Sequence, residues 1–298
     1  MGKVIFMFPG QGSQYPGMGK DLYDKYDIAK EVFHKAQKFM GKDFLEMIFE
    51  GDEEVLMKTE NTQPAIYTVS VAALETIRHL GIMDYDMVMG HSLGEFSALY
   101  AAGVVDFLQG LKLVKIRGEL MAEANKGGGM AAIIGMDEKD IAQVVNRYPN
   151  VIIANYNSPG QIVISGSTDE LNSALEELKP HAKRIIPLKV SGAFHSPMME
   201  EAARKFSRYL NKDEMNPPKV PIIMNVTGRA ATTLNEVHSA LVKQLTGSVR
   251  FIDMTNTAYE MGARKFVEVG PGKVLQGLVR RILRDKKDVE ITGSEALL

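Results

Sequence analysis

Residues 87–102 read MVMGHSLGEFSALYAA, and the fold class is decided here. Met87–Met89 is a short apolar run typical of a buried strand, and the spacing over Leu93–Ala102 predicts a helix. Residues 90–94 match G-x-S-x-G, the nucleophile elbow, in which small flanking residues allow a sharp turn that exposes the serine above a sheet. The alternative is a glycine-bounded turn in which Ser92 only caps the helix. The strand–turn–helix context favours a nucleophile.

Strands and helices alternate on both sides of this stretch. Apolar runs, beginning with Val4–Phe8, alternate with amphipathic segments such as Thr62–Leu80 and Phe107–Ala124. This order predicts an α/β fold with a mostly parallel sheet. The later predicted elements are helices near Met198–Leu210, Asn235–Leu245 and Lys273–Leu283, and strands at Pro221–Asn225 and Phe266–Val269.

The pattern changes after a triple glycine at residues 127–129. The following segments have the order β-α-β-β-α-β, which is typical of a ferredoxin-like unit. We therefore predict a large domain formed by residues 1–126 and 197–298, and a small inserted domain formed by residues 127–196. The six segments are Met130–Ile134, Glu138–Tyr148, Val151–Asn155, Gln161–Ser165, Asp169–Leu178 and Arg184–Val190.

Composition narrows the chemistry. The chain has 298 residues and a net charge of −2, so electrostatics give no reason to expect a nucleic-acid partner. It has no cysteine, which excludes disulfides, a thiolate nucleophile and thiolate metal sites, and no metal is predicted. The N-terminal apolar run is too short for a signal sequence or a membrane span. We expect a cytoplasmic protein that does not act on membranes.

A nucleophilic serine needs a base, and the chain has six histidines. Most lie in Lys- and Glu-rich helical segments, where a solvated side chain is the default. His195 differs, because it lies in a loop directly after a predicted strand and before a helix, a position favoured by active-site residues. No orienting carboxylate is evident for it. A backbone carbonyl could serve instead, because the Nδ1 proton needs only an acceptor.

Arg117 falls within the apolar stripe of its predicted helix, four residues after Leu113 and three before Leu120. An inward-facing charge without a partner would cost about 3–5 kcal/mol. The sequence leaves two partners open, a protein carboxylate and a substrate carboxylate. The guanidinium suits the second, because it binds a carboxylate through two parallel hydrogen bonds.

A glycine-containing loop, GQGSQ at residues 10–14, follows the first predicted strand. Its glycines let the backbone approach a ligand closely, and its amides could supply an oxyanion donor. The spacing is not G-x-G-x-x-G, so a dinucleotide site is not predicted, and no cofactor is expected.

Five segments together resemble the malonyl-CoA:acyl carrier protein transacylase family, over nearly the whole chain. They are PGQGSQ at 9–14, GHSLGE at 90–95, Arg117 in its helix, GAFHS at 192–196 and EVGPG at 268–272. The resemblance implies an α/β-hydrolase-like large domain with a ferredoxin-like insert. It also implies malonyl-CoA as substrate and acyl carrier protein as partner, with transfer supplying fatty acid synthesis.

The resemblance also implies catalytic roles. Ser92 would carry the acyl group and His195 would act as the general base. The backbone carbonyl of Gln244 would hold His195, which accounts for the missing carboxylate. The amides of Gln11 and Leu93 would form the oxyanion hole.

Specificity is implied at two further positions. Arg117 would bind the free carboxylate of malonate, and Phe194 is the variant that accompanies malonyl rather than methylmalonyl in this family. The chain departs from the family at Ser248 and Phe251, where proline and tryptophan are frequent, and this bears on the geometry of the Gln244 loop.

Three other functions remain as alternatives to this assignment: a trans-acting polyketide synthase acyltransferase, a serine thioesterase and an inactive carrier-binding scaffold.

Overall fold

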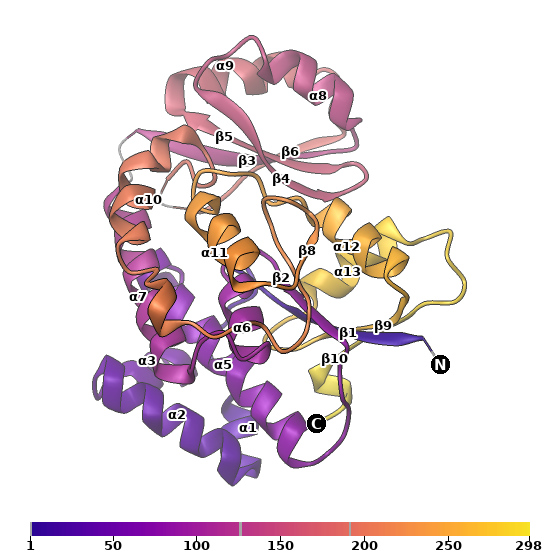
Figure 1. Ribbon diagram of the computed structural model, residues 1–298. Coiled ribbons are helices and arrows are strands. Elements are labelled where there is room, and N and C mark those ends of the chain that lie inside the picture. Colours follow the sequence, from indigo (N-terminus) through magenta and orange to yellow (C-terminus); the bar gives the residue numbers. More distant parts are fainter. Residues whose placement is uncertain (1, 125–126, 191) are drawn as a thin grey trace.

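The computed structural model describes residues 2–124, 127–190 and 192–298, and Figure 1 shows two stacked parts. The larger part is built on a six-stranded sheet with the order β10-β9-β1-β2-β7-β8. All neighbouring strands are parallel except the edge pair β7 and β8. The strands are β1 (Lys3–Phe8), β2 (Met87–Gly90), β7 (Ile222–Ile223), β8 (Ala230–Ala231), β9 (Ala263–Glu268) and β10 (Glu290–Gly293).

Helices cover both faces of this sheet because its strands alternate apolar side chains between two cores. In β1, Phe6 and Phe8 belong to one core, whereas Ile5 and Met7 belong to the other. The first core is packed against α1 (Lys20–Lys25), α2 (Asp27–Met40), α3 (Phe44–Phe49), α4 (Glu53–Leu56), α5 (Thr59–His79), α6 (Gly94–Ala101), α7 (Phe107–Glu123), α10 (Glu200–Ser207) and α11 (Leu234–Lys243). The second is packed against α12 (Phe251–Glu260) and α13 (Val274–Ile282).

The smaller part is an antiparallel four-stranded sheet with the order β4-β5-β3-β6, covered on its outer face by two helices (Figure 1). The chain passes through β3 (Gly128–Ile134), α8 (Glu138–Val145), β4 (Val151–Ser158), β5 (Gln161–Ser167), α9 (Thr168–Leu178) and β6 (Arg184–Pro187). The predicted β-α-β-β-α-β order and the α/β class are confirmed. The boundaries at 126/127 and 196/197 stay a prediction, and residue 126 lies outside the described residues.

Several predicted elements differ in extent, and others were not predicted. Helix α10 is preceded by a 3₁₀ turn, η1 (Pro197–Met199), which begins at a proline, a first-turn position where the missing N–H removes no hydrogen bond. Strand β7 has two residues where five were predicted. The pattern gave no prediction for α1 to α4, α12 or β10. Two of these helices have six residues and one has four, too short for a periodic stripe to show.

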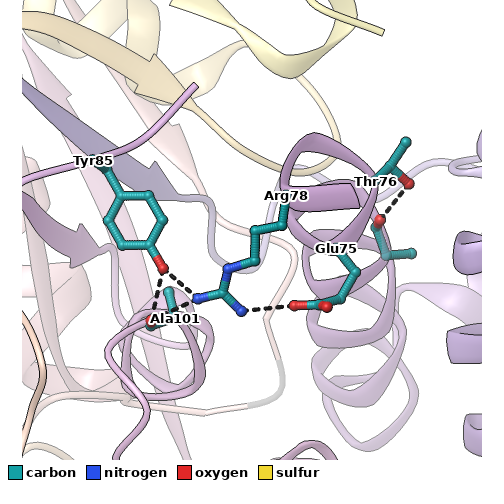
Figure 2. A network of polar contacts seen from close by, with 6 residues as sticks. Glu75, Thr76, Arg78, Tyr85 and Ala101 are labelled. Atoms are coloured by element: carbon teal, nitrogen blue, oxygen red, sulfur yellow. Dashed lines mark hydrogen bonds and ion pairs between the residues drawn. The ribbon is translucent and has the colours of Figure 1, made fainter. Parts of the chain in front are cut away.

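The far end of α6 is anchored to α5 by Arg78 (Figure 2). Its Nη2 donates to the Ala101 carbonyl at 2.8 Å, and the Tyr85 hydroxyl donates to the same oxygen at 2.7 Å. Arg78 also contacts the Tyr85 hydroxyl, and its Nη1 lies 2.7 Å from Glu75 Oε1. A cation at the C-terminus of a helix satisfies carbonyls left without partners and suits the negative end of the helix dipole. The network therefore fixes the helix that begins just after Ser92.

Within the described ranges, no helix combines the length and apolar character needed to cross a membrane.

Candidate active site

The elbow at Ser92 depends on close packing of backbone. Ser92 lies between β2 and α6 with φ 51°. A Cβ at Gly90 would lie 2.0 Å from the Gly94 backbone, and a Cβ at Gly94 would lie 2.0 Å from the Phe8 carbonyl oxygen. Only glycine fits at either position, which is the requirement that the G-x-S-x-G spacing expresses.

His195 is placed to accept the Ser92 proton. Its Nε2 lies 2.7 Å from Ser92 Oγ, and its Nδ1 lies 3.0 Å from the carbonyl oxygens of both Gln244 and Gly247. Carbonyls can only accept, so Nδ1 carries the ring proton and Nε2 presents a lone pair to the serine. Backbone carbonyls thus occupy the place of the carboxylate that the sequence did not reveal.

The environment of His195 favours its neutral form. The side chain is 2% exposed. Burial, followed by the positive charge of Arg117, lowers the pKa of His195 to about 3. The imidazole is therefore unprotonated at neutral pH and able to act as a base.

Arg117 is buried beside the serine and is 1% exposed. Its Nη2 donates to Ser92 Oγ at 3.1 Å, and the guanidinium also donates to Gln63 Oε1 at 2.8 Å and to Gln244 Oε1 at 2.9 Å. In the described part of the chain no carboxylate oxygen lies within 4.0 Å of its nitrogens. Of the two partners left open by the sequence, a direct protein carboxylate is thus not found.

Gln244 contributes more than the carbonyl that the resemblance implied. Its side chain accepts from Arg117 and donates through Nε2 to the Ser92 carbonyl at 2.7 Å. One residue therefore contacts His195, Arg117 and the Ser92 backbone. This role was not predicted, because the contact joins positions 152 residues apart.

The other predicted residues share one cavity of about 270 Å³ with Ser92 and His195. Gln11, Leu93 and Phe194 line it with Arg117, whereas Gln244 lies outside the set of lining residues. Among the described residues, the backbone N–H groups of Gln11 and Leu93 donate to no backbone carbonyl, so both can donate to a ligand oxygen. In the same residues no group of three or more His, Asp or Glu side chains is placed to hold a metal ion.

His91, next to the nucleophile, is directed elsewhere. Its Nε2 lies 2.7 Å from Asn157 Oδ1, and burial lowers its pKa. Its ring lies 5.5 Å from that of Phe251, one of the two departures from the family pattern. The smaller ring of Phe251 is fully buried there, so this position is filled without tryptophan.

The loop that carries Gln244 is attached to the small sheet. Ser248 Oγ donates to the Ile153 carbonyl at 2.7 Å, and the Val249 N–H donates to the Ala154 carbonyl at 2.8 Å. Tyr156 N–H donates in return to the Val249 carbonyl at 2.9 Å. The serine found here in place of proline thus supplies a contact of its own, and the Gln244 carbonyl oxygen lies 3.0 Å from His195 Nδ1.

The family model described as acyl transferase domain matches residues 5–294. A malonyl CoA-acyl carrier protein transacylase of Bacillus subtilis is 43% identical over 304 residues, covering 100% of this chain and 96% of the relative. This chain belongs to the malonyl-CoA:acyl carrier protein transacylase family. A transacylase of the same name from Synechocystis is 43% identical over 283 residues, covering 95% of this chain and 94% of the relative.

Solved structures of this transacylase family share the fold. The acyl carrier protein S-malonyltransferase of Vibrio cholerae superposes with a TM-score of 0.92 at 39% identity, covering 98% of this chain and 96% of that one. A malonyl-transacylase solved in complex with a type II polyketide synthase acyl-carrier protein gives a TM-score of 0.92 at 36% identity, covering 98% and 94%.

Proposed function

We propose that this chain transfers malonyl from malonyl-CoA to the phosphopantetheine thiol of an acyl carrier protein, through an ester on Ser92. The observation that carries the proposal is the contact of Ser92 Oγ with both His195 and Arg117. A base lies on one side of the hydroxyl, and on the other lies a buried cation with no carboxylate oxygen within 4.0 Å among the described residues; this pair suits an acyl group that ends in a carboxylate.

In the first half-reaction His195 Nε2 takes the proton of Ser92 as Oγ bonds to the thioester carbonyl carbon. The amides of Gln11 and Leu93 stabilise the tetrahedral oxyanion. Its collapse breaks the carbon–sulfur bond. The thiol of coenzyme A leaves with the proton that His195 returns.

In the second half-reaction the carrier thiol takes the place of coenzyme A. His195 removes its proton, the sulfur attacks the ester, and Ser92 leaves with that proton. The charge on Nδ1–H of the imidazolium is stabilised in both halves by the carbonyls of Gln244 and Gly247.

Arg117 selects the acyl group by its carboxylate. A malonyl carboxylate would accept hydrogen bonds from the guanidinium and form the direct ion pair that Arg117 lacks among the described residues, where the buried Glu95 carboxylate interacts with its charge only at longer range. A hydrogen bond to a charged group contributes about 1.5–3 kcal/mol. Phe194, which is 5% exposed on the cavity wall, would crowd an additional methyl on the acyl chain.

The product distinguishes this proposal from a thioesterase. Purified enzyme is incubated with malonyl-CoA, with and without a holo-carrier, and products are separated by chromatography. We expect malonyl carrier with little free malonate. Release of malonate at the rate of coenzyme A, with no malonyl carrier, would contradict a transferase.

Carriers of fatty acid synthesis and of a type II polyketide synthase are to be compared in this assay. Faster loading of the first supports a supply of malonyl units to fatty acid synthesis. Faster loading of the second would assign the chain to the polyketide alternative.

The cytoplasm, expected from the sequence, is the compartment proposed for the reaction.

A further inference from the structure

Asn225 connects both sides of the elbow turn. It follows β7, is fully buried, and approaches the turn from the neighbouring strand. Its Oδ1 accepts from the Ser92 N–H at 2.7 Å, and its Nδ2 donates to the Gly90 carbonyl at 2.7 Å. These two contacts bracket His91. They hold the turn in which Ser92 adopts its left-handed backbone conformation.

Glu95 fixes which way the Asn225 amide points. Its Oε1 accepts from the Asn225 N–H at 2.7 Å and from Asn225 Nδ2 at 2.8 Å. Both hydrogens of Nδ2 are thereby directed to acceptors, Gly90 O and Glu95 Oε1. The amide oxygen can then face only the Ser92 N–H, because the reversed amide would set two N–H groups against each other.

We propose that Glu95 and Asn225 are positioning residues for the nucleophile: Glu95 orients the Asn225 amide, and Asn225 holds Ser92 Oγ between His195 and Arg117. This inference rests on the proposed function, in which Ser92 is acylated. Neither residue lines the cavity in the described part of the chain. Asn225 acts through the backbone of Ser92, whereas Glu95 acts through Asn225 and also interacts with the Gln244 side chain and the charge of Arg117. A displacement of reacting atoms by about 1 Å costs about a hundredfold in rate, so such support matters.

The carboxylate of Glu95 is suited to this task in either protonation state. It is 1% exposed, and burial raises its pKa to about 7. Its second oxygen, Oε2, is buried and has no hydrogen-bond partner among the described residues. A proton on Oε2 leaves Oε1 free to accept from Asn225, so the orienting contacts persist. Glutamine presents the same acceptor oxygen and should replace Glu95, whereas alanine should not.

The test measures single-turnover acylation of Ser92 with quenched-flow intact-mass detection, at malonyl-CoA concentrations raised stepwise to saturation. For Asn225→Ala, Asn225→Asp and Glu95→Ala we expect the acylation rate constant to fall 10- to 100-fold. In the Asn225 variants the malonyl-CoA concentration for half-maximal rate should change less than threefold, because Asn225 contacts the elbow backbone and not the cavity-lining groups. Glu95→Gln should stay within threefold of the wild type in both parameters.

A matched control comes from a second Glu–Asn pair. Glu170 of α9 accepts from the backbone N–H of Asn150 at 2.8 Å and contacts its Nδ2, in the loop before β4. Glu170→Ala removes equivalent contacts away from Ser92 and should leave acylation unchanged. Thermal melts show whether each variant is folded, and the isosteric Asn225→Asp keeps the test usable if Asn225→Ala is not.

The outcomes separate the two proposals. Wild-type acylation with unchanged rates in folded Asn225→Asp and Glu95→Ala would overturn the positioning role and leave the proposed function standing. An equal loss in Glu95→Gln and Glu95→Ala would also overturn the orienting role. Absence of acylation in the wild type would instead refute the proposed function.

Discussion

Strain is concentrated at two residues of the site. Ser92 and His195, with φ 51° and 57°, are the non-glycine residues with positive φ in the chain as described. A left-handed conformation costs a residue with a Cβ about 1–2 kcal/mol. Such strain persists only where surrounding contacts impose it, and it is typical of functional sites. The contacts of Asn225 with Ser92 and of Gln244 with His195 are of this kind.

Relief of this strain should be measurable at Ser92. Ser92→Gly and Ser92→Ala both lose the hydroxyl contacts with His195 and Arg117, but only glycine accepts φ 51° freely. We expect Ser92→Gly to be more stable to denaturant than Ser92→Ala by about 0.75 kcal/mol, because about 1–2 kcal/mol of strain is relieved and about 0.5–1 kcal/mol is lost to the greater chain entropy of glycine. Equal stabilities would show that the turn is not strained.

The pKa of His195 sets the pH dependence of acylation. Burial and Arg117 lower it to about 3, so the base stays unprotonated as pH falls through 6.5, the ordinary value. Between pH 5 and pH 8, we expect the single-turnover acylation rate to stay above half of its maximum, with no drop centred near pH 6.5. The Glu95→Gln variant serves as control, because Glu95 has a raised pKa of about 7. A half-fall near 6.5 in both proteins would contradict a depressed His195 pKa.

At the scale of elements, the site depends on how α6 is held at both ends. The N-terminus of α6 follows Ser92, and the carbonyl of Ala101 at its C-terminus accepts hydrogen bonds from Arg78 and Tyr85.

The elbow, the insert and the inward position of Arg117 could be predicted because they are local patterns: glycine spacing, strand alternation and helical period. Asn225, Glu95, Gln63 and the Gln244 side chain could not, because their contacts depend on which strands become neighbours.

Removal of Arg78 should loosen α6. Arg78→Ala leaves the Ala101 carbonyl with one fewer donor and removes a cation from the helix end. We expect the free energy of unfolding to fall by about 1–2 kcal/mol in urea denaturation. Lys35→Ala is the control, since Lys35 belongs to an exposed pair at 3.9 Å from Glu31 and should change stability by less than about 0.5 kcal/mol. Equal effects would refute a capping role.

At the scale of the whole molecule, the cavity lies where the two sheets meet. The large part supplies Ser92 and Arg117, and the small sheet supplies Met130, Asn155 and Val163. The Gln244 loop joins them through Val249, which pairs with β4. The position of His195 is therefore linked to the docking of the small sheet.

Hydrogen exchange tests this link. The amide of Val249 donates to Ala154, so it should exchange at least a hundredfold more slowly than an unprotected loop amide. Exchange is followed by mass spectrometry or NMR at neutral pH. The exposed Lys35→Ala variant should show the same protection. Exchange of Val249 at the unprotected rate would show that the loop is not fastened to β4.

The acyl-enzyme is the central claim, and intact-mass spectrometry tests it most directly. The enzyme is mixed briefly with malonyl-CoA in the absence of carrier, beside Ser92→Ala, Arg117→Ala and an acetyl-CoA control. We predict a malonyl adduct on the wild type, none on Ser92→Ala, and at least a tenfold weaker preference for malonyl over acetyl in Arg117→Ala. No adduct on the wild type, or an adduct that persists in Ser92→Ala, would contradict the account.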